Sequence, residues 1–558
     1  MVGGVFRFYG LNWGAPYHHF HIDEHYIFAG ADLLRRSAAD AADSLKFFMY
    51  PPLPHRVLNV LRAVYEWFAH PLDLTVPKDE VTYMVMGRAI SATLSTATIP
   101  VVYLIGARLG GRLAGVLAAV LLACSVLHLR DAHFLTTDSS LAFFSTLTWW
   151  YAFHLLDGAG VATNVKTGIA FGLAVLSKYT AVFLAPLIAL AHLLSPQAPR
   201  QLFPLRAWRA PVFKAVGAGL VGLAVFLIID PMIITHYARF RQDLQEQIFD
   251  PVLSGVGGGA QAPQFYAQFG DVNQRTFWFT NVLWWGMGPA WELWGLAGVV
   301  WLLLRRDRAA FLAGTFPIVF WLVASQSVAP FPRYAIPLMP ALAVSAAVLS
   351  ADWLRRPQLR LIALTATAAV LTTTALWAGA YLNVYRQPDS RLQASAWLLE
   401  NVPRDSKILI EPSHGIPPMG SYLTSVDFFK NYVMFYPETE RHDYYHLFPL
   451  DMYRSLWNRG VTDDWRREYI RGQLALADWI VMDDQFVQQY QHQPESEHGV
   501  VKQYYRDLFA GKLEFALVKT FKVYPSIFGW RINDDDAELT FRSFDHPKIY
   551  IFRRFRPS

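Results

Sequence analysis

The sequence predicts a polytopic α-helical membrane protein with a C-terminal soluble α/β domain. Of its 558 residues, 53% are hydrophobic and 17% are charged, whereas soluble domains carry about 25% charged residues. Long apolar runs alternate with short basic segments over residues 88–385, and residues 386–558 are rich in charge. We therefore expect a first outer segment (1–87) with interfacial helices and an acidic motif, a transmembrane helical domain (88–385) and an extracytoplasmic α/β domain (386–558).

The charge balance and the cysteine count argue against a nucleic-acid partner, an intramolecular disulfide and a cysteine-based metal site. Lys and Arg outnumber Asp and Glu by 49 to 44, and the excess lies mostly between apolar runs. Membrane orientation accounts for that excess, so we expect no nucleic-acid partner. Cys124 is the single cysteine and lies in an apolar run. An intramolecular disulfide and a cysteine-based metal site are therefore both excluded.

Eight apolar runs each predict one membrane-spanning helix. They cover residues 88–106, 113–129, 139–156, 211–229, 283–304, 309–328, 334–351 and 359–382. A ninth run, 166–194, is too long for one span and contains Lys178 and Pro186. Because these residues disfavour one continuous apolar helix, we predict two short or broken helices here, which gives roughly ten spans in all.

The loops between these runs predict the orientation of the protein in the plasma (inner) membrane. Cytoplasmic loops carry an excess of Lys and Arg. Alternate loops here contain Arg108, Arg112, Lys166, Arg200, Arg206, Arg209, Arg305, Arg306, Arg308, Arg355, Arg356 and Arg360. We assign these loops to the cytoplasm, which places residues 1–87, 130–138, 230–280, 329–333 and the tail on the outer face.

The first outer segment has no span before it. Residues 1–13 are too short to cross a bilayer, so we expect that a first membrane-spanning helix is missing from this sequence. Apolar side chains then recur at helical spacing at Val57, Val60, Leu61, Val64, Trp67 and Phe68. This pattern predicts an amphipathic helix that either lies in the membrane interface or packs on other helices, with Arg62 and Glu66 paired on another face.

The tail alternates predicted helices and strands. We expect a helix over 392–400 and strands over 407–411, 479–482 and 515–523. A final strand pair is predicted over 538–544 and 548–553, joined by a turn at Asp545-His546-Pro547. Together these segments predict a small α/β domain.

An acidic motif lies near the start of the first outer segment. The run HFHIDEHY places two carboxylates among three imidazoles, namely Asp23 and Glu24 among His19, His21 and His25. An Asp carboxylate here can act as a general base toward an acceptor hydroxyl. The same side chains are also ligand types for a divalent metal near His21, Asp23 and His25. The simpler alternative is that Asp23 only caps a helix over 24–34.

A second polar motif, RDAHFLTTDSS, covers residues 130–140 in a predicted outer loop. Its charged and imidazole side chains are Arg130, Asp131, His133 and Asp138. Asp131 and Asp138 are seven residues apart and share a face if the segment is helical. The alternative is that residues 137–139 cap the following span. Capping leaves Arg130 unexplained, because an arginine on a short outer loop runs against the charge rule.

Two further cations lie beside apolar spans. Arg333 and Tyr334 belong to FPRYAIP, and Arg333 is the sole charge on its predicted outer loop. Its planar donor fork suits a phosphate, and the alternative is that it extends to the outer headgroups. Lys178 lies within an apolar run, where an ionisable residue indicates function. The alternative is a lysine simply held at the turn between two short helices.

The order of these motifs resembles a known family. HIDEHY, RDAHFLTTDSSLAFF at 130–144, LSKYTAVFLAPL at 176–187 and FPRYAIPLMPAL at 331–342 are similar to the GT-C fold polyprenyl-phosphate-sugar-dependent glycosyltransferases. This family includes the protein O-mannosyltransferases and the lipid A aminoarabinose transferases. The tail resembles bacterial members in DSRLQASAWLLENVP at 389–403 and ELTFRSFDHPKIYIFRR at 538–554. The resemblance covers nearly the whole chain and implies a GT-C-like fold.

The resemblance also implies roles for the candidate residues. Asp23 would be the catalytic acidic residue, with Glu24 beside it. Arg130, Lys178 and Arg333 are similar to residues that contact the lipid phosphate. With their neighbours they form the expected substrate-binding set of Arg130, Asp131, His133, Asp138, Lys178, Arg333 and Tyr334.

These expectations combine into one function. We expect an inverting hexosyl or pentosyl transferase that moves a sugar from a polyprenyl-phosphate donor to an envelope acceptor, which is a protein, a lipid or a glycan. Its expected partners are this donor, an acceptor of unknown identity and the lipid bilayer. We expect no cofactor, because three cations could neutralise the leaving phosphate.

Other classes of protein remain as alternatives. Within enzymes, the alternative is a ligase or phosphotransferase acting on envelope glycans. From other classes, the alternatives are a membrane transporter or flippase and an assembly scaffold for cell-envelope polysaccharide. A transporter typically has polar residues near the bilayer midplane and an internal repeat, and the sequence shows neither.

Overall fold

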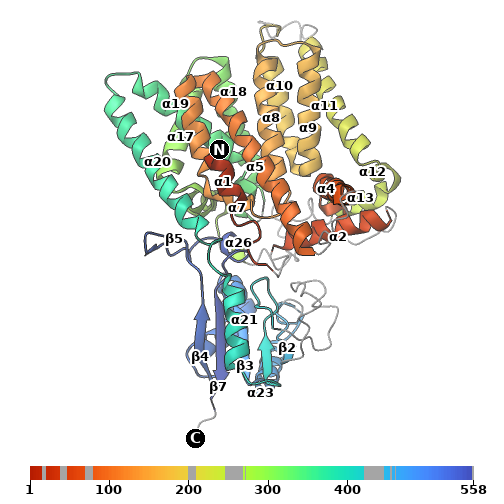
Figure 1. Ribbon diagram of the computed structural model, residues 1–558, viewed down its shortest axis with the longest axis vertical. Coiled ribbons are helices and arrows are strands. Elements are labelled where there is room, and N and C mark those ends of the chain that lie inside the picture. The colour runs from red at the N-terminus through yellow and green to blue at the C-terminus, as the bar shows by residue number, and fades with distance from the viewer. Residues whose placement is uncertain are drawn as a thin grey trace. The chain divides into compact units, whose positions relative to one another are not determined.

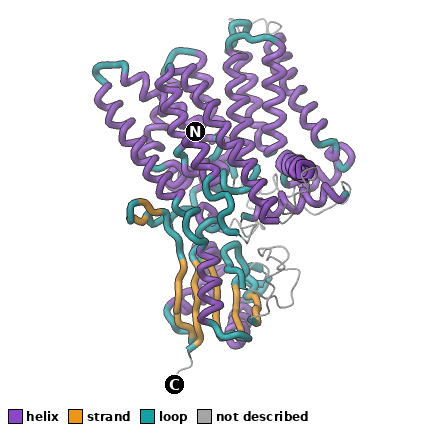
Figure 2. The backbone as a smooth tube through the Cα atoms, viewed as in Figure 1, coloured by secondary structure: helices purple, strands orange, loops and turns teal. Residues whose placement is uncertain are grey.

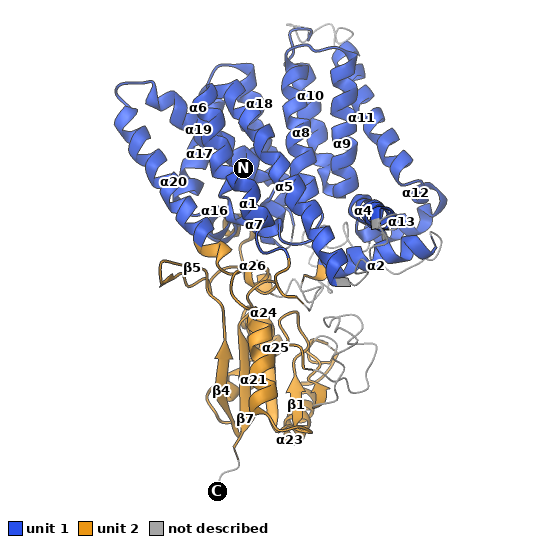
Figure 3. Cartoon of the chain, in the orientation of Figure 1, with its two compact units in different colours: residues 1–11, 23–256, 278–379 blue, residues 12–22, 257–277, 380–558 orange. Residues whose placement is uncertain are grey.

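The computed structural model describes residues 1–15, 21–37, 47–69, 80–198, 209–245, 268–270, 272–327, 329–419, 445–452, 455–458 and 460–555. The chain forms two compact units, which Figure 3 shows in different colours. The first unit comprises Met1–Leu11, Asp23–Val256 and Trp278–Gly379, and the second comprises Asn12–Ile22, Gly257–Phe277 and Ala380–Ser558. The predicted α/β tail, 386–558, lies within the second unit.

The described residues of the first unit are built from helices and loops (Figures 1 and 2). In its amino-terminal part the helices are α1 (Val2–Phe8), α2 (Ile22–Arg36), η1 (Phe47–Met49), α4 (Leu53–Ala69), α5 (Glu80–Gly110), α6 (Arg112–Ala123), α7 (Val126–Asp131) and α8 (Asp138–Leu156). Then follow α9 (Val161–Ser177), η3 (Tyr179–Leu184), α10 (Ala185–Leu193), α11 (Arg209–Ile229), α12 (Met232–Thr235) and α13 (Tyr237–Leu244). The last group is the π-helical turn η7 (Trp278–Leu283), α16 (Trp284–Met287), α17 (Pro289–Leu304), α18 (Arg308–Ala324), η8 (Pro332–Ala335), α19 (Leu338–Leu354) and α20 (Arg360–Leu382), whereas the short helix α15 (Gln274–Phe277) before η7 belongs to the second unit.

The apolar helices coincide with the predicted spans in position. In the described part of the chain, three helices are long and apolar enough to cross a membrane alone: Val81–Gly110, Arg209–Ile229 and Arg360–Leu382. The bent pair Gln274–Met287 and Pro289–Leu304 would make a fourth span. Five further apolar helices have 10–17 residues. The predicted fold class is confirmed, although several helices are shorter than the sequence suggested.

Two breaks shorten predicted spans, and a third lies where the sequence predicted it. The predicted span 113–129 divides into α6 and α7 at Cys124 and Ser125. The predicted span 283–304 bends by 116° at Gly288, whose φ of 88° suits glycine. The predicted break in 166–194 is confirmed, because Lys178 has extended backbone (φ −157°, ψ 127°) between α9 and η3.

Helix α1 is anchored to the bundle by a buried arginine. The Arg7 guanidinium donates to the carbonyl oxygens of Leu122 (3.0 Å) and Ala123 (3.1 Å) and to Ser95 Oγ (2.7 Å). The two carbonyls belong to the last turn of α6, where the helix leaves carbonyl groups without intrahelical partners. The short first segment, which was predicted not to span a bilayer, is therefore held in place by polar contacts with α5 and α6.

The amphipathic helix predicted from residue 57 is α4. Its apolar residues Val60, Leu61, Val64, Trp67 and Phe68 are exposed in one stripe. The predicted ion pair between Arg62 and Glu66 is wrong: Arg62 pairs with Asp32 at 2.5 Å, and Glu66 pairs with Arg35 at 3.2 Å. Both partners come from α2, so these two charged side chains of α4 pair with a neighbouring helix and not with each other.

Glycine allows close approach between α9 and α11. A Cβ atom on Gly168 would lie 2.5 Å from the carbonyl oxygen of Ala218, and one on Gly172 would lie 2.6 Å from that of Gly222. Small residues of this kind let membrane helices pack backbone against backbone. This packing fixes the end of α9, after which Lys178 follows.

The second unit contains a mixed five-stranded sheet, and Figure 2 shows its strands in orange. The strand order is β2-β1-β3-β7-β4, with β1 (Lys407–Ile410), β2 (His446–Pro449), β3 (Trp479–Asp483), β4 (Phe515–Phe521) and β7 (Ile549–Arg554). Strands β2, β1 and β3 are parallel, and β7 is antiparallel to β3 and β4. A two-stranded ribbon pairs β5 (Ser526–Ile527) with β6 (Trp530–Arg531).

The helices of the second unit are α21 (Ser390–Asn401), α23 (Asp463–Leu476), α24 (Gln485–Gln491), α25 (Glu495–Phe509) and α26 (Leu539–Arg542). The predicted helix 392–400 and the predicted strands 407–411, 479–482 and 515–523 are confirmed. The predicted strand 538–544 is wrong. Glu538 caps the short helix α26 by accepting from the backbone N–H groups of Thr540 (2.8 Å) and Phe541 (3.2 Å), so this segment cannot pair with β7.

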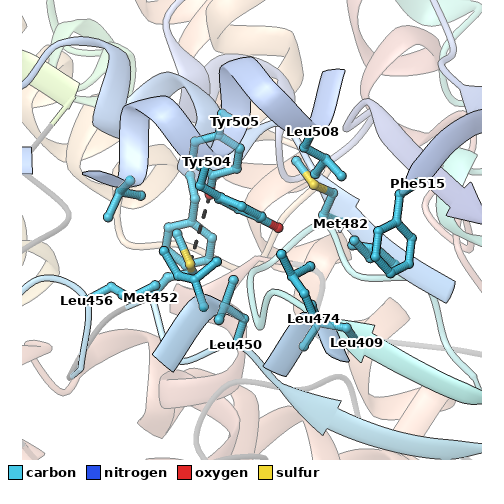
Figure 4. Close-up of a cluster of buried hydrophobic side chains, with 14 of the residues drawn as sticks. Leu409, Leu450, Met452, Leu456, Leu474, Met482, Tyr504, Tyr505, Leu508 and Phe515 are labelled. Carbon is cyan, nitrogen blue, oxygen red and sulfur yellow. Dashed lines mark hydrogen bonds between the residues drawn. The ribbon is translucent and has the colours of Figure 1, made fainter. Parts of the chain in front are cut away.

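An apolar cluster holds this sheet to its helices. Figure 4 shows Leu409 of β1, Met482 of β3 and Leu508 of α25 within it, and all three are buried. Tyr504 and Tyr505 of the same helix also belong to the cluster and are directed into it (Figure 4). Burial of side chains of this size is the main stabilising contribution to such a domain.

Candidate active site

Asp23 lies in the first turn of α2 and is 3% exposed. Its Oδ1 accepts a hydrogen bond from the Tyr50 hydroxyl at 2.8 Å, and its Oδ2 accepts one from Arg333 Nη1 at 3.0 Å. Neither of these two contacts is a helix cap. Two polar partners from distant parts of the sequence instead hold the carboxylate in a fixed orientation.

Arg333 belongs to η8, and its side chain is 21% exposed. Its guanidinium also lies over the rings of Phe331 (5.3 Å) and Tyr334 (5.8 Å). The carboxylate of Asp23 raises the pKa of Arg333 against the opposing effect of burial. The Arg333 side chain therefore contacts an acidic group within the protein.

Lys178 and Asp138 form a second ion pair. Lys178 Nζ donates to Asp138 Oδ1 at 2.7 Å and lies 4.6 Å from the centre of the Tyr334 ring. Asp138 is fully buried and opens α8, yet its side chain caps no backbone N–H group. The break after α9 thus directs Lys178 toward Asp138, and the capping alternative fails for Asp138.

The ring of Tyr334 connects the two ion pairs. Both Lys178 and Arg333 place their charge near this ring, and the charge of Asp138 also acts on Arg333. The structure therefore brings five predicted residues together, namely Asp23, Asp138, Lys178, Arg333 and Tyr334. They come from α2, α8, the α9–η3 break and η8.

Asp131 lies beside this group. It accepts hydrogen bonds from the hydroxyls of Thr136 (2.9 Å) and Ser139 (2.7 Å). Burial, followed by the negative charge of Asp138, raises the pKa of Asp131. The two carboxylates that were predicted to share a face are thus electrostatically coupled, and Asp131 is held by local hydroxyls.

Glu24 points away from Asp23 into a buried ion pair. Arg88 donates to both of its oxygens, at 2.9 and 3.1 Å, and the backbone N–H group of Leu135 donates to Oε1 at 3.0 Å. The side chains of Glu24 and Arg88 are both fully buried. Arg88 also donates to the carbonyl oxygen of Leu11 at 3.1 Å. This network joins α2, α5 and the 131–137 segment, which is an arrangement suited to positioning α2.

Arg130 and His133 are buried close to α7. The guanidinium of Arg130 lies 5.3 Å from the centre of the Phe134 ring. The ring nitrogens of His133 lie 2.9 Å from the carbonyl oxygens of Leu129 and Tyr9. Helix α7 packs against η8, so Arg130 is near the element that carries Arg333.

The histidines of the acidic motif diverge. The His21 ring lies on Phe544 at 4.1 Å, and the His25 ring contacts Tyr26 at 5.6 Å. His19 lies outside the described residues. No group of three or more His, Cys, Asp or Glu side chains that could hold a metal ion occurs in the part of the chain that the structure describes.

Sequence reasoning missed three residues of interest. Tyr50 hydrogen-bonds Asp23 and Arg88 pairs with Glu24, but neither belongs to a recognisable motif. Glu292 lies in the first turn of α17, is 5% exposed and has no hydrogen bond or ion pair with the described residues. It is a single acid in the predicted span 283–304, and this signal could have identified it.

Comparison with known proteins supports the family resemblance. Residues 16–236 match the family model described as dolichyl-phosphate-mannose-protein mannosyltransferase. No curated protein sequence matches the chain.

Two solved structures of low sequence identity are among those similar to this chain. The structure of ArnT from Cupriavidus metallidurans bound to undecaprenyl phosphate is 16% identical, with 99% of this chain and 96% of that chain covered and a TM-score of 0.47. The apo oligosaccharyltransferase of Archaeoglobus fulgidus is 13% identical, with 88% and 67% covered and a TM-score of 0.48. These scores are too low to support an argument about function. The family model covers residues 16–236 only, and its description agrees with the resemblance that the sequence motifs indicated.

Proposed function

We propose that this protein is an inverting glycosyltransferase that moves a sugar from a polyprenyl-phosphate donor to an envelope acceptor on the outer face of the plasma membrane. The observation that carries the proposal is the direct contact between Asp23 and Arg333, 3.0 Å apart. It joins a carboxylate suited to general base catalysis with a cation suited to phosphate, from positions 310 residues apart in sequence.

The carboxylate of Asp23 is the proposed base. It accepts the proton of an acceptor hydroxyl while the hydroxyl oxygen forms a bond to the anomeric carbon of the donor sugar. The bond between that carbon and the phosphate oxygen breaks, and its electron pair leaves with the lipid phosphate. A single displacement of this kind inverts the anomeric configuration.

Arg333 and Lys178 are the proposed ligands of the leaving phosphate. An arginine fork binds phosphate oxygens in two directions, and a lysine supplies a compact charge. Fixed cations at the point where charge develops stabilise the transition state without reorganisation. Arg130 is proposed as a third cation because α7 packs against η8. Since cations on the chain can neutralise the leaving group, we propose that transfer needs no metal.

The remaining candidates are proposed to support these groups. Glu24 and Arg88 position α2, because their buried contacts fix its first turn. Asp138 orients Lys178 through the 2.7 Å ion pair. Tyr334 lies against both proposed phosphate ligands, and Asp131 and His133 keep the 130–138 segment in place through local hydrogen bonds.

A lipid-linked donor fits the predicted topology better than a nucleotide sugar. Nucleotide sugars are held in the cytoplasm, and the longest predicted cytoplasmic loop covers about residues 195–210. A nucleotide-binding βαβ unit needs roughly 30 or more residues. A donor that meets Asp23 on the predicted outer face has crossed the membrane already, which a polyprenyl chain permits.

The experiment is incubation of the purified protein with a panel of polyprenyl-phosphate sugars and an extract of envelope acceptors, with lipid phosphate release and product anomeric configuration as readouts. We expect release from at least one donor with inversion. Asp23→Asn should lower the rate by about 10²–10⁴-fold, the usual contribution of a general base. Asp32→Asn removes the same charge from the same helix outside the site and should leave the rate unchanged. Retention of configuration, or full activity of Asp23→Asn, would reject the mechanism.

A further inference from the structure

The two cations that are proposed to bind the donor phosphate are already occupied by carboxylates. Arg333 binds Asp23 at 3.0 Å, and Lys178 binds Asp138 at 2.7 Å. The two positive and two negative charges of this group cancel. A phosphate that enters therefore has to compete with an internal anion for each of these two cations.

The positions of these side chains allow each cation to exchange its carboxylate partner for a phosphate. The side chains of Arg333 and Lys178 are 21% and 20% exposed, whereas those of Asp23 and Asp138 are 4% and 0% exposed. The cations thus present the accessible side of each pair, and the carboxylates form the buried side. In addition, Arg333 Nε is buried without a hydrogen-bond partner among the described residues, so the guanidinium has a donor left for an incoming oxygen.

Asp23 has a second partner that does not depend on the cation. The hydroxyl of Tyr50 donates to Oδ1 at 2.8 Å, on the oxygen that Arg333 does not contact. Burial raises the pKa of Tyr50 well above its usual value, with the charge of Asp23 as the next contribution, so this hydroxyl keeps its proton and remains a donor. If Arg333 turns toward a phosphate, Tyr50 still holds Oδ1 of the Asp23 carboxylate, and Arg333 no longer occupies Oδ2.

We propose that Asp23 and Asp138 are internal competitors of the lipid phosphate, and that donor binding moves Arg333 and Lys178 from carboxylate to phosphate and thereby releases Asp23 as the base. This inference rests on the proposed function and adds an order of events to it. The donor binds first, and the base becomes available only when the donor is in place. The acceptor hydroxyl is then activated only beside a bound sugar.

The exchange makes an unusual prediction about binding. Removing the charge of the proposed base should strengthen the binding of the lipid phosphate, because Arg333 no longer has a competing anion. A charge-assisted hydrogen bond is strong enough that its release should tighten the dissociation constant by roughly tenfold. Asp138→Asn should act in the same direction through Lys178. If Asp23 served only to orient the donor, the same substitution would weaken binding or leave it unchanged.

The test measures binding of a polyprenyl phosphate without sugar to the full-length protein in nanodiscs. Asp23→Asn and Asp138→Asn should each bind about tenfold more tightly than the wild type. The matched control is Asp32→Asn on α2, whose carboxylate pairs with Arg62 at 2.5 Å and is 49% exposed. It changes the net charge equally and should bind like the wild type. If Asp23→Asn does not fold, Asp138→Asn gives an independent reading.

A double variant isolates the exchange from general electrostatics. In an Arg333→Gln background, Asp23→Asn should no longer tighten binding, because the cation for which the two anions compete is gone. If the wild type binds the lipid phosphate and neither Asp23→Asn nor Asp138→Asn binds it more tightly, the exchange is overturned. The proposed function is not affected by that result. A gain of equal size in Asp32→Asn also overturns the exchange. Failure of the wild type and of every variant to bind the lipid phosphate rejects the proposed function itself, and the exchange with it.

Discussion

Two neighbouring carboxylates at the start of α2 have different partners. Asp23 contacts a tyrosine and an arginine whose side chain is one-fifth exposed, whereas Glu24 forms a fully buried pair with Arg88. Neighbours on a helix are rotated by about 100°, so adjacent residues face different surroundings. The sequence alone suggested a shared catalytic role for the pair, and the contacts favour a division between chemistry and support.

This division predicts different consequences of substitution. Glu24→Gln removes one charge from a buried pair and leaves Arg88 without its counter-ion, which typically costs about 3–5 kcal/mol. We expect a large drop in thermal stability of the detergent-solubilised protein, with residual transfer by the fraction that stays folded. Glu24→Gln combined with Arg88→Met should recover part of the loss. Wild-type stability together with lost transfer would instead place Glu24 in the chemistry.

The sequence identified the residues that could carry the chemistry, but it did not identify which of them contact each other. Lys178 and Arg333 were recognised because charged residues beside apolar runs are uncommon, and Asp23 and Asp138 were recognised from the polar motifs that contain them. Their partners could not be deduced, because Asp23 and Arg333 are 310 residues apart. Tyr50 carries no local signal of any kind. Arg62 and Glu66 show the opposite error, since correct helical spacing predicted a pair that α2 replaces with better partners.

Breaks in the helices could be predicted from the sequence where a single residue type causes them. A lysine within an apolar run predicted the break at Lys178, and the structure confirms it. The strand expected over 538–544 failed because its alternating pattern also fits a short helix, and Glu538 decides between them by capping. A cap depends on a few hydrogen bonds that periodicity does not reveal.

Helix α4 carries an exposed apolar stripe that we expect to lie in the membrane interface. Cys124 is the single native cysteine, so a Cys124→Ala background accepts one engineered label. A polarity-sensitive fluorophore on Val64→Cys should report an apolar environment in nanodiscs, because Val64 is 43% exposed beside Trp67 and Phe68. The same label on Glu400→Cys of α21 is the water-exposed control. Equal, water-like emission at both positions would contradict the interfacial placement.

The residue directly after strand β1 carries a carboxyl group, and this group predicts that the stability of the domain depends on pH. Glu411 is fully buried and accepts hydrogen bonds from Tyr504 (3.0 Å) and Tyr505 (2.9 Å). Burial raises the pKa of Glu411 from 4.5 to about 8. Between these two values the unfolded chain releases a proton that the folded domain retains, so this group lowers stability as pH rises from 5 to 8.

Glu411→Gln removes this titration while keeping the shape of the side chain. We expect the opening free energy of the β1 and β3 amides to fall less between pH 5 and pH 8 in this variant than in the wild type. Hydrogen exchange on the full-length protein, corrected for the intrinsic pH dependence of exchange, measures the difference. If the opening free energy depends on pH identically in the two proteins, the pKa of Glu411 is not raised by burial.

For the whole molecule, the distribution of charge predicts which parts face the cytoplasm. Arg305, Arg306 and Arg308 follow the apolar helix α17 directly, and such clusters remain inside. A reporter that is active only outside the cytoplasm should therefore be silent when fused after Arg306 and active when fused after Ser558. Activity at the first position and silence at the second would place Asp23 on the wrong face for a donor that has crossed the membrane.

Each conclusion about the site depends on the identity of the donor. The most direct measurement supplies the purified protein with an envelope acceptor extract and matched donors of one sugar, one linked to a nucleotide and one linked to a polyprenyl phosphate. We predict transfer from the polyprenyl-phosphate donor, release of one lipid phosphate per sugar transferred, and unchanged activity when divalent metals are chelated. Transfer from the nucleotide donor alone would contradict the proposed function and the roles given to Asp23, Lys178 and Arg333.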